Sequence, residues 1–291
     1  MQIAIIGTGI AGMGCAHRLH KMHDITVYEQ DNYIGGHTNT VYVNEGEIHI
    51  PIDTGFIVFN NENYPHLNAL FNTINAPIKK TSMSFAAHIV HENVEYCGSS
   101  LDGLFAQRKN IFSPRYVRFL MQSTPPDTSA KFPALTLVRF FKNHGFLGLN
   151  TQFQWYTVDG GSEEYKKRLI APFKDKMNIN AGIVGVKKVD GKIELTTKTG
   201  DIKSFDKVII ATHADQALKI LQNPTELDTQ LLSCFSYQQN KATLHTDSDL
   251  MPSVKKVWSS WNYRTEIINN NLVASCTYWM NSLQDVSKQK N

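Results

Sequence analysis

The sequence predicts an α/β fold in which a parallel sheet is interrupted by an inserted α+β region. Residues 2–6 form an apolar run, residues 11–20 carry small and apolar residues at helical spacing, and residues 25–29 alternate as a strand does. This order makes a βαβ unit with parallel strands. A second buried strand, KVIIAT at 207–212, precedes another helix. With 291 residues, the chain is expected to form one large domain or two interleaved ones.

Local patterns predict the elements between these two strands. We expect a β-ribbon over 41–59 that turns at 44–46, a helix over 63–76 and strands within 79–97. The remaining expectations are amphipathic helices over 100–148, two strands between 179 and a turn at 190–191, and one strand between that turn and a second turn at 199–200. Further strands are expected over 234–246 and 256–279.

A glycine-rich turn lies between the first strand and the first helix. It consists of Gly7, Gly9, Ile10, Ala11 and Gly12. The G-x-G-x-x-G spacing permits a tight turn and close backbone approach, and the amides that open the helix favour a diphosphate. Glu29 ends the second strand about 20 residues later, where a carboxylate accepts hydrogen bonds from a ribose and repels a 2′-phosphate. The turn therefore predicts a dinucleotide site, although glycines at such a junction can also serve packing alone.

Composition argues against several other classes of protein. The net charge is only +3 and no dense Lys/Arg block occurs, so no nucleic-acid partner is expected. The four cysteines lie far apart without a CxxC pair, which indicates reduced thiols in a cytoplasmic protein. No apolar stretch reaches the roughly 18 to 20 residues of a membrane span, and the amino terminus lacks the basic start of a signal peptide.

A second glycine pair follows the acidic strand, with Gly35-Gly36, then His37 and Thr40. This arrangement resembles the signature of flavoproteins of the amine-oxidase and phytoene-desaturase superfamily, which more often has Arg or Lys in place of His37. The stretches IPIDTGFIVFN, WYTVDGGSEEYKKRL, FDKVIIATHADQAL and KATLHTDSDLMP resemble one bacterial branch of predicted NAD/FAD-binding proteins, which often accompany fatty-acid-modifying enzymes in genomes. The resemblance covers nearly the whole chain. It implies a Rossmann-like FAD-binding domain of the second glutathione-reductase type, with an inserted α+β substrate domain.

The resemblance also implies a division of the chain and a set of cofactor contacts. FAD-binding segments are expected at 1–60 and 151–220, a helical substrate region at 61–150, and a substrate-domain sheet at 221–291. We do not find the superfamily's last flavin-binding segment in this sequence. Besides the glycine turn, the implied FAD-binding residues are Glu29, Gly35, Gly36, His37, Thr40, Asp53, Gly55, Phe56, Ile183, Ala211 and Thr212.

The implied reaction is transfer of a hydride from an apolar substrate, such as a fatty-acyl chain, to the flavin. No catalytic side chain is assigned, and no triad is visible in the sequence. Two rival interpretations stay open. One is a catalytically inactive chain that binds a nucleotide without the last flavin segment. The other is an NAD-dependent dehydrogenase, which would need a second glycine fingerprint.

Two pairs of features have a functional and a structural interpretation. His88 and His91 would point to opposite faces of a strand, which argues against a metal site. Residues 109–120 and 133–146 interleave basic and aromatic residues. They predict either a patch that docks on anionic lipid or helices with solvated basic faces. The sequence makes no prediction of the oligomeric state.

Three residues near the glycine pair Gly160-Gly161, and His213 after the returning strand, also have more than one interpretation. Trp155 and Tyr156 either line the substrate side of the flavin or pack in the core. Ser162 either serves the junction between the domains or caps the helix that follows it, with two glutamates in the first turn. His213 follows the returning strand and starts a helix beside the expected cofactor.

Overall fold

The computed structural model confirms the α/β fold and describes residues 1–98, 101–104, 106–108 and 153–287. Helix α3 (Leu101–Leu104) is the only described part of the expected helical region 100–148 that forms a helix. The stretches 109–120 and 133–146 lie outside the described residues. Within the described part of the chain, no helix combines the length and the apolar character needed to cross a bilayer.

The amino-terminal βαβ unit forms the parallel sheet that the sequence predicts. Strand β1 (Gln2–Ile6) lies between β2 (Asp24–Tyr28) and β14 (Lys207–Ile210) and is parallel to both. Strand β10 (Met177–Asn178) extends the sheet beside β2, and helix α1 (Ile10–Leu19) connects β1 to β2. The chain therefore leaves this sheet after β2 and returns to it about 150 residues later, as an inserted region requires.

Alternate side chains of β1 enter two different cores, because successive residues of a strand point to opposite faces. Ile3 and Ile5 pack beneath α1 and α7 (Glu163–Ile170). Ala4 and Ile6 pack on the other face, against a three-stranded antiparallel sheet. Both faces of the parallel sheet are thus covered, which explains the continuous apolar runs of β1 and β14.

The antiparallel sheet on the second face confirms the turns expected at 190–191 and 199–200 and the strand between them, but a single strand precedes the first turn and an unexpected strand, β13 (Ile202–Phe205), follows the second. The sheet has the order β11-β12-β13, with β11 (Ile183–Val189) and β12 (Lys192–Thr197). The connecting turns place Gly191 at φ +83° and Gly200 at φ +92°, where a glycine is favoured over other residues.

The expected ribbon is also present, but it ends earlier than 59. Strands β3 (Thr40–Glu45) and β4 (Ile48–Asp53) pair in antiparallel fashion around Gly46. After Asp53 the chain leaves the ribbon and enters a second sheet of order β5-β9-β6. The elements of this region are β5 (Phe59–Asn60), β9 (Trp155–Val158), β6 (Ile78–Thr81), α2 (Pro65–Thr73) and α10 (Met280–Gln284). The 3-10 helix η3 (Ala171–Lys176) follows α7 and packs instead against α1 and β2 of the parallel sheet.

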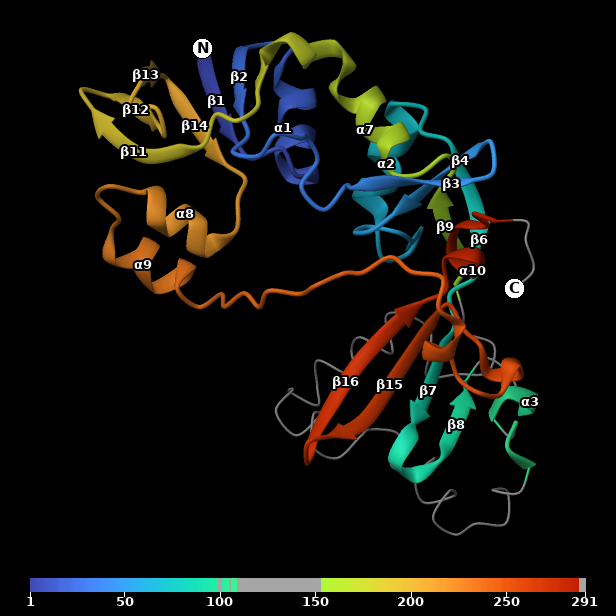
Figure 1. Cartoon of the computed structure of the whole chain (residues 1–291). Coiled ribbons are helices and arrows are strands. Elements are labelled where there is room, and N and C mark those ends of the chain that lie inside the picture. Colours follow the sequence, from blue (N-terminus) through green and yellow to red (C-terminus); the bar gives the residue numbers. More distant parts are fainter. Residues whose placement is uncertain (99–100, 105, 109–152, 288–291) are drawn as a thin grey trace.

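A four-stranded sheet of order β16-β15-β7-β8 lies below this region in Figure 1. Strand β15 (Trp261–Ile268) runs parallel to β7 (Phe85–Ile89) and antiparallel to β16 (Asn271–Tyr278). Strand β8 (Val94–Cys97) completes the sheet. Short 3-10 helices flank it, namely η1 (Val90–Glu92), η4 (Ser248–Leu250) and η5 (Lys255–Val257).

The prediction of a strand over 234–246 is wrong. After α8 (Ala214–Ile220) and α9 (Glu226–Leu232), residues 233–247 form an irregular and fully exposed connection, which we call the connecting segment. It runs from α9 to the β7–β15 sheet (Figure 1). A strand needs a hydrogen-bonded neighbour, and no ladder partner for this segment exists among the described residues. Similarly, residues 256–260 precede β15 instead of belonging to it.

Candidate functional site

The inner side of the glycine turn has no room for side chains. Gly7 has φ +101°, and a Cβ atom on it would lie 2.5 Å from the carbonyl oxygen of Ala211. A Cβ atom on Gly12 would lie only 2.0 Å from the carbonyl oxygen of Gly7. Both contacts are with backbone, which cannot move aside as a flexible side chain can. The first and third glycines are therefore required by the packing of β1, β14 and α1.

The outer side of the turn is open. A Cβ atom on Gly9 would meet nothing within 4 Å, and Ile10 is 40% exposed. Gly9 is the N-cap of α1, no side chain caps this helix, and its first turn contains no acidic residue. Among the residues that the structure describes, no side chain accepts a hydrogen bond from the amides at this end of the helix, and these amides carry the partial positive charge that favours an anion. This arrangement fits a diphosphate.

The carboxylate of Glu29 is directed to the glycine turn. Its Oε2 atom accepts hydrogen bonds from both the amide, at 3.0 Å, and the hydroxyl of Thr8, and its Oε1 atom accepts one from the amide of Asp31 at 3.1 Å. A carboxylate offers about four acceptor positions, so one remains for a further donor such as a ribose hydroxyl. Thr8 was not among the predicted site residues, because the motif leaves its position unspecified.

The second glycine pair packs directly on the first motif. The amide of Gly35 donates to the Thr8 hydroxyl at 3.1 Å, and Gly35 has φ +133°. A Cβ atom on Gly36 would lie 3.3 Å from the Cα atom of Gly9. The two glycine motifs therefore form one continuous backbone surface, although Gly9 and Gly36 are 27 residues apart in the sequence. His37 follows on this surface with an exposed side chain.

Three further residues predicted to bind the cofactor, Ala211, Thr212 and Ile183, lie around the same edge of the parallel sheet. Ala211 closes over Gly7, and its amide extends the β1–β14 ladder by donating to the carbonyl oxygen of Ile6 at 2.8 Å. Thr212 follows, with its hydroxyl on the next carbonyl oxygen. The Ile183 side chain is buried in the core, but the chain just before it runs beside Glu29, whose carbonyl oxygen accepts from the Ala181 amide at 2.7 Å.

Asp53 is a buried carboxylate at the centre of a hydrogen-bond network, and it is 2% exposed. It accepts the amide of Ser162 at 2.9 Å and the Ser162 hydroxyl at 2.7 Å. The Thr40 hydroxyl donates at 2.6 Å and the Gln284 amide group at 2.7 Å. Asp53 therefore caps α7 from outside that helix. Ser162 occupies the N-cap position of α7 with two glutamates in the first turn, as expected, but its side chain makes no capping bond to the helix and donates to Asp53 instead.

Gly55 is close to protein backbone instead of open space. A Cβ atom on it would lie 2.0 Å from the carbonyl oxygen of His37, and the Phe56 amide donates to that same oxygen at 3.2 Å. The Phe56 ring packs against the rings of Phe59 and Tyr64. Residues 55 and 56 thus hold the backbone of His37 in place beside the glycine surface.

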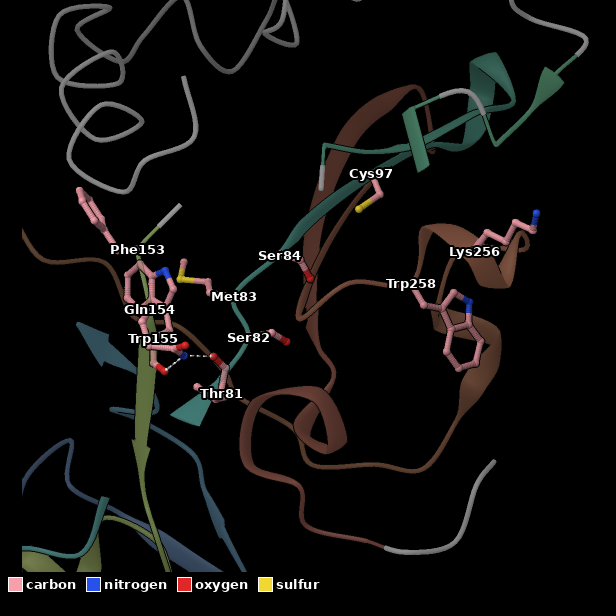
Figure 2. Close-up of a pocket in the computed structure, with 10 residues that line it drawn as sticks. All are labelled: Thr81, Ser82, Met83, Ser84, Cys97, Phe153, Gln154, Trp155, Lys256 and Trp258. Atoms are coloured by element: carbon pink, nitrogen blue, oxygen red, sulfur yellow. Dashed lines mark hydrogen bonds between the residues drawn. The ribbon is translucent and has the colours of Figure 1, made fainter. Parts of the chain in front are cut away.

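A pocket of about 560 Å³ lies between β6, β9 and the sheet that contains β8. Figure 2 shows Met83 and Trp155 on one side of it and Trp258 on the other, with serine hydroxyls between them. Trp155 is 3% exposed and belongs to the core, yet it also lines this pocket. Lys256 contributes its side chain to the wall, and its ammonium group lies 3.3 Å from a carboxylate oxygen of Asp102.

The two histidines near β7 do not come together. His88 lies on β7, where its Nε2 atom is 3.2 Å from the buried carboxylate of Glu95. His91 lies in η1, with its Nε2 atom 4.0 Å from the carboxylate of Glu92. Burial lowers the pKa of His88 below its ordinary value, although the Glu95 charge opposes this. In the part of the chain that the structure describes, no group of three or more side chains could hold a metal ion.

Comparison with known protein families gives two matches. Residues 5–74 match the NAD(P)-binding Rossmann-like domain, and residues 98–266 match the flavin containing amine oxidoreductase family. The second match covers more than half of the chain. No curated protein matches the sequence.

Solved structures with the same fold include two amine oxidases and a fatty acid isomerase. Cyclohexylamine oxidase from Brevibacterium oxydans IH-35A has a TM-score of 0.58 at 18% identity, over 80% of this chain and 62% of its own. Putrescine oxidase bound to putrescine gives 0.58 at 15%, over 80% and 63%. The CLA-producing fatty acid isomerase from P. acnes gives 0.52 at 14%, over 79% and 63%. The chain thus spans less than two thirds of the length of these structures.

Proposed function

Because the chain belongs to the family of flavin-containing amine oxidoreductases, we propose that it is an FAD-dependent oxidoreductase. The observation that carries the proposal is the joint surface of Gly9 and Gly36, which is open on its outer side and crowded on its inner side. When bound, FAD supplies the chemistry by accepting a hydride from the substrate. The protein binds, orients and shields the reacting partners.

Each half of the nucleotide site has a distinct task in this proposal. The amides of Gly9, Ile10 and Ala11 hold the diphosphate at the start of α1, where the helix dipole favours negative charge. Glu29 binds a ribose hydroxyl with its remaining acceptor position. His37 supplies a further donor next to the glycine surface.

Thr40, Asp53, Gly55 and Phe56 act indirectly in this proposal, because their hydrogen bonds and packing are made within the protein. They fix the ribbon and the backbone of His37 relative to α7. Their contribution to cofactor binding is therefore to hold this geometry, a role that differs from the direct flavin contact the resemblance implies.

We further propose an apolar substrate with a polar end, such as a fatty-acyl chain. Two observations support this class. The pocket combines a wall of methionine and tryptophan side chains with a row of hydroxyls. One of the structures that share the fold is described as a fatty acid isomerase. The other structures named above are amine oxidases, so amines are the alternative class of substrate.

Titration of the purified protein with FAD tests the first proposal. We expect flavin absorbance to co-purify with the protein or to be retained after addition of FAD and gel filtration. NAD is the matched control ligand, and it should not raise the melting temperature as FAD does. A protein that retains no flavin, or that is stabilised by NAD alone, would contradict the proposal.

Anaerobic reduction of the bound flavin tests the substrate class. Long-chain fatty acids, putrescine and cyclohexylamine are compared, with loss of flavin absorbance as the readout. Reduction by a fatty acid and not by the amines is the expected result. Reduction by amines alone would refute the apolar class, and binding of FAD without reduction by any donor would favour a nucleotide-binding protein that turns nothing over.

A further inference from the structure

Three aromatic rings from separate segments stack beside the glycine surface. The ring centroids of His37 and His213 are 6.0 Å apart with planes 25° from parallel. The rings of His213 and Tyr237 are 4.2 Å apart and only 4° from parallel. We call this group the ring stack. It joins the loop after β2, the turn after β14 and the connecting segment.

Tyr237 is fixed at both ends of its side chain. Its ring lies on His213, and its hydroxyl oxygen accepts a hydrogen bond at 2.9 Å from the amide of Ala214, the first residue of α8. All other residues of the connecting segment are exposed as well, so no core packing forces this contact. His213 is the N-cap of α8, and its side chain makes no capping bond, which leaves its ring available to the stack.

The stack is adjacent to the residues that bind the cofactor in the proposed function. His37 follows Gly36, which lies against Gly9. The backbone of His37 is held by Phe56 and covered by Gly55, whereas its exposed side chain contacts the ring of His213, the one ring contact it makes within the described part of the chain. A donor that is already oriented binds a ligand more tightly, because less side-chain freedom is lost on binding.

We propose that Tyr237 and His213 are positioning residues that hold the His37 imidazole ready to donate to the diphosphate of the cofactor. This inference rests on the proposed function, since it assumes that the glycine surface binds a dinucleotide. Tyr237 acts through His213 and His37 and need not touch the cofactor. The connecting segment, which links α9 to the β7–β15 sheet, thereby contributes to the nucleotide site.

A double-mutant cycle on ligand affinity tests the proposal. The variants are Tyr237→Ala, His37→Ala and the double variant, and dissociation constants are measured for FAD, ADP and adenosine. We expect Tyr237→Ala to weaken binding of FAD and ADP about three- to tenfold, the range of one aromatic contact. In the His37→Ala background the second substitution should have no further effect. Adenosine lacks the diphosphate, so its affinity should not change.

Two control variants separate positioning from folding. Phe235→Ala removes an exposed ring from the same segment without touching the stack, and it should bind FAD as the wild type does. Tyr237→Phe keeps the ring and should stay within about twofold of the wild type. Melting temperatures of all variants show that each is folded.

Different results overturn different parts. The positioning role is overturned, while FAD binding stands, by any of three results. Tyr237→Ala lowers FAD affinity equally in the wild-type and His37→Ala backgrounds, it also lowers the affinity for adenosine, or it leaves FAD affinity unchanged. Wild-type protein that binds neither FAD nor ADP overturns the proposed function, and the inference with it.

Discussion

Substitution of Gln284 by alanine should cost several kcal/mol, although this residue lies far from the glycine turn. Its side chain makes two hydrogen bonds with Asp53: Oε1 accepts the Asp53 amide at 2.9 Å and Nε2 donates to Oδ2 at 2.7 Å. Both residues are almost fully buried, so water cannot replace the lost partner. An unsatisfied buried amide costs about 1–3 kcal/mol and a lost bond to a charged group about 1.5–3 kcal/mol. The sum is roughly 2.5–6 kcal/mol.

A thermal melt followed by circular dichroism measures this loss. For a chain of this size, about 2 °C per kcal/mol predicts a melting temperature roughly 5–12 °C lower. Gln230→Ala is the matched control, an exposed glutamine on α9 whose loss should change the melting temperature by about 1 °C or less. Gln284→Glu keeps an acceptor for the Asp53 amide but sets two carboxylates against each other, so it should be at least as unstable at neutral pH. If Gln284→Ala melts like Gln230→Ala, the network does not stabilise the fold.

Two further predictions concern the glycine turn and the buried histidine. Gly12→Ala places a Cβ atom 2.0 Å from a backbone oxygen and should reduce FAD affinity more than about tenfold. The control Gly14→Ala places a Cβ atom where nothing lies within 4 Å, so this variant should bind FAD normally and gain up to about 1 kcal/mol of stability. Equal FAD affinities of the two variants would refute the packing argument. Because burial lowers the pKa of His88, the unfolded chain takes up a proton before the folded one as pH falls below about 6.5, so stability should fall from about pH 7 to pH 5. Melting curves of His88→Asn should show a smaller fall, and an unchanged pH dependence would contradict the assignment.

The parts of the fold that the sequence predicts are those set by local spacing. The βαβ unit follows from the apolar run at 2–6, the three glycines and the strand that ends at Glu29. The returning strand β14 could be predicted because a short apolar run bounded by polar residues is typical of a strand in a parallel sheet that is covered on both faces. The β3–β4 ribbon and the β11-β12-β13 sheet contain strands with alternating residues that are separated by glycine turns.

The parts that the sequence misses depend on contacts between distant segments. Gln284 and Asp53 are 231 positions apart. Nothing in the polar residues 282–291 indicates that a glutamine there binds a carboxylate in the ribbon. Thr8 bridges Glu29 and Gly35 from a position that the glycine motif leaves free. The segment 234–246 alternates as a strand does, but alternation cannot supply a neighbouring strand.

The central position of β1 has a consequence for the order in which the chain folds. One edge of β1 pairs with β2, which is synthesised soon after it. The other edge pairs with β14, whose residues are synthesised 204 positions later, as Lys207 is relative to Ile3. At about 5–20 residues per second, a ribosome needs roughly 10–40 s to deliver that partner. During this interval one hydrogen-bonding edge of the most apolar strand in the sheet stays unpaired, and the nascent protein must be protected from pairing with a neighbour.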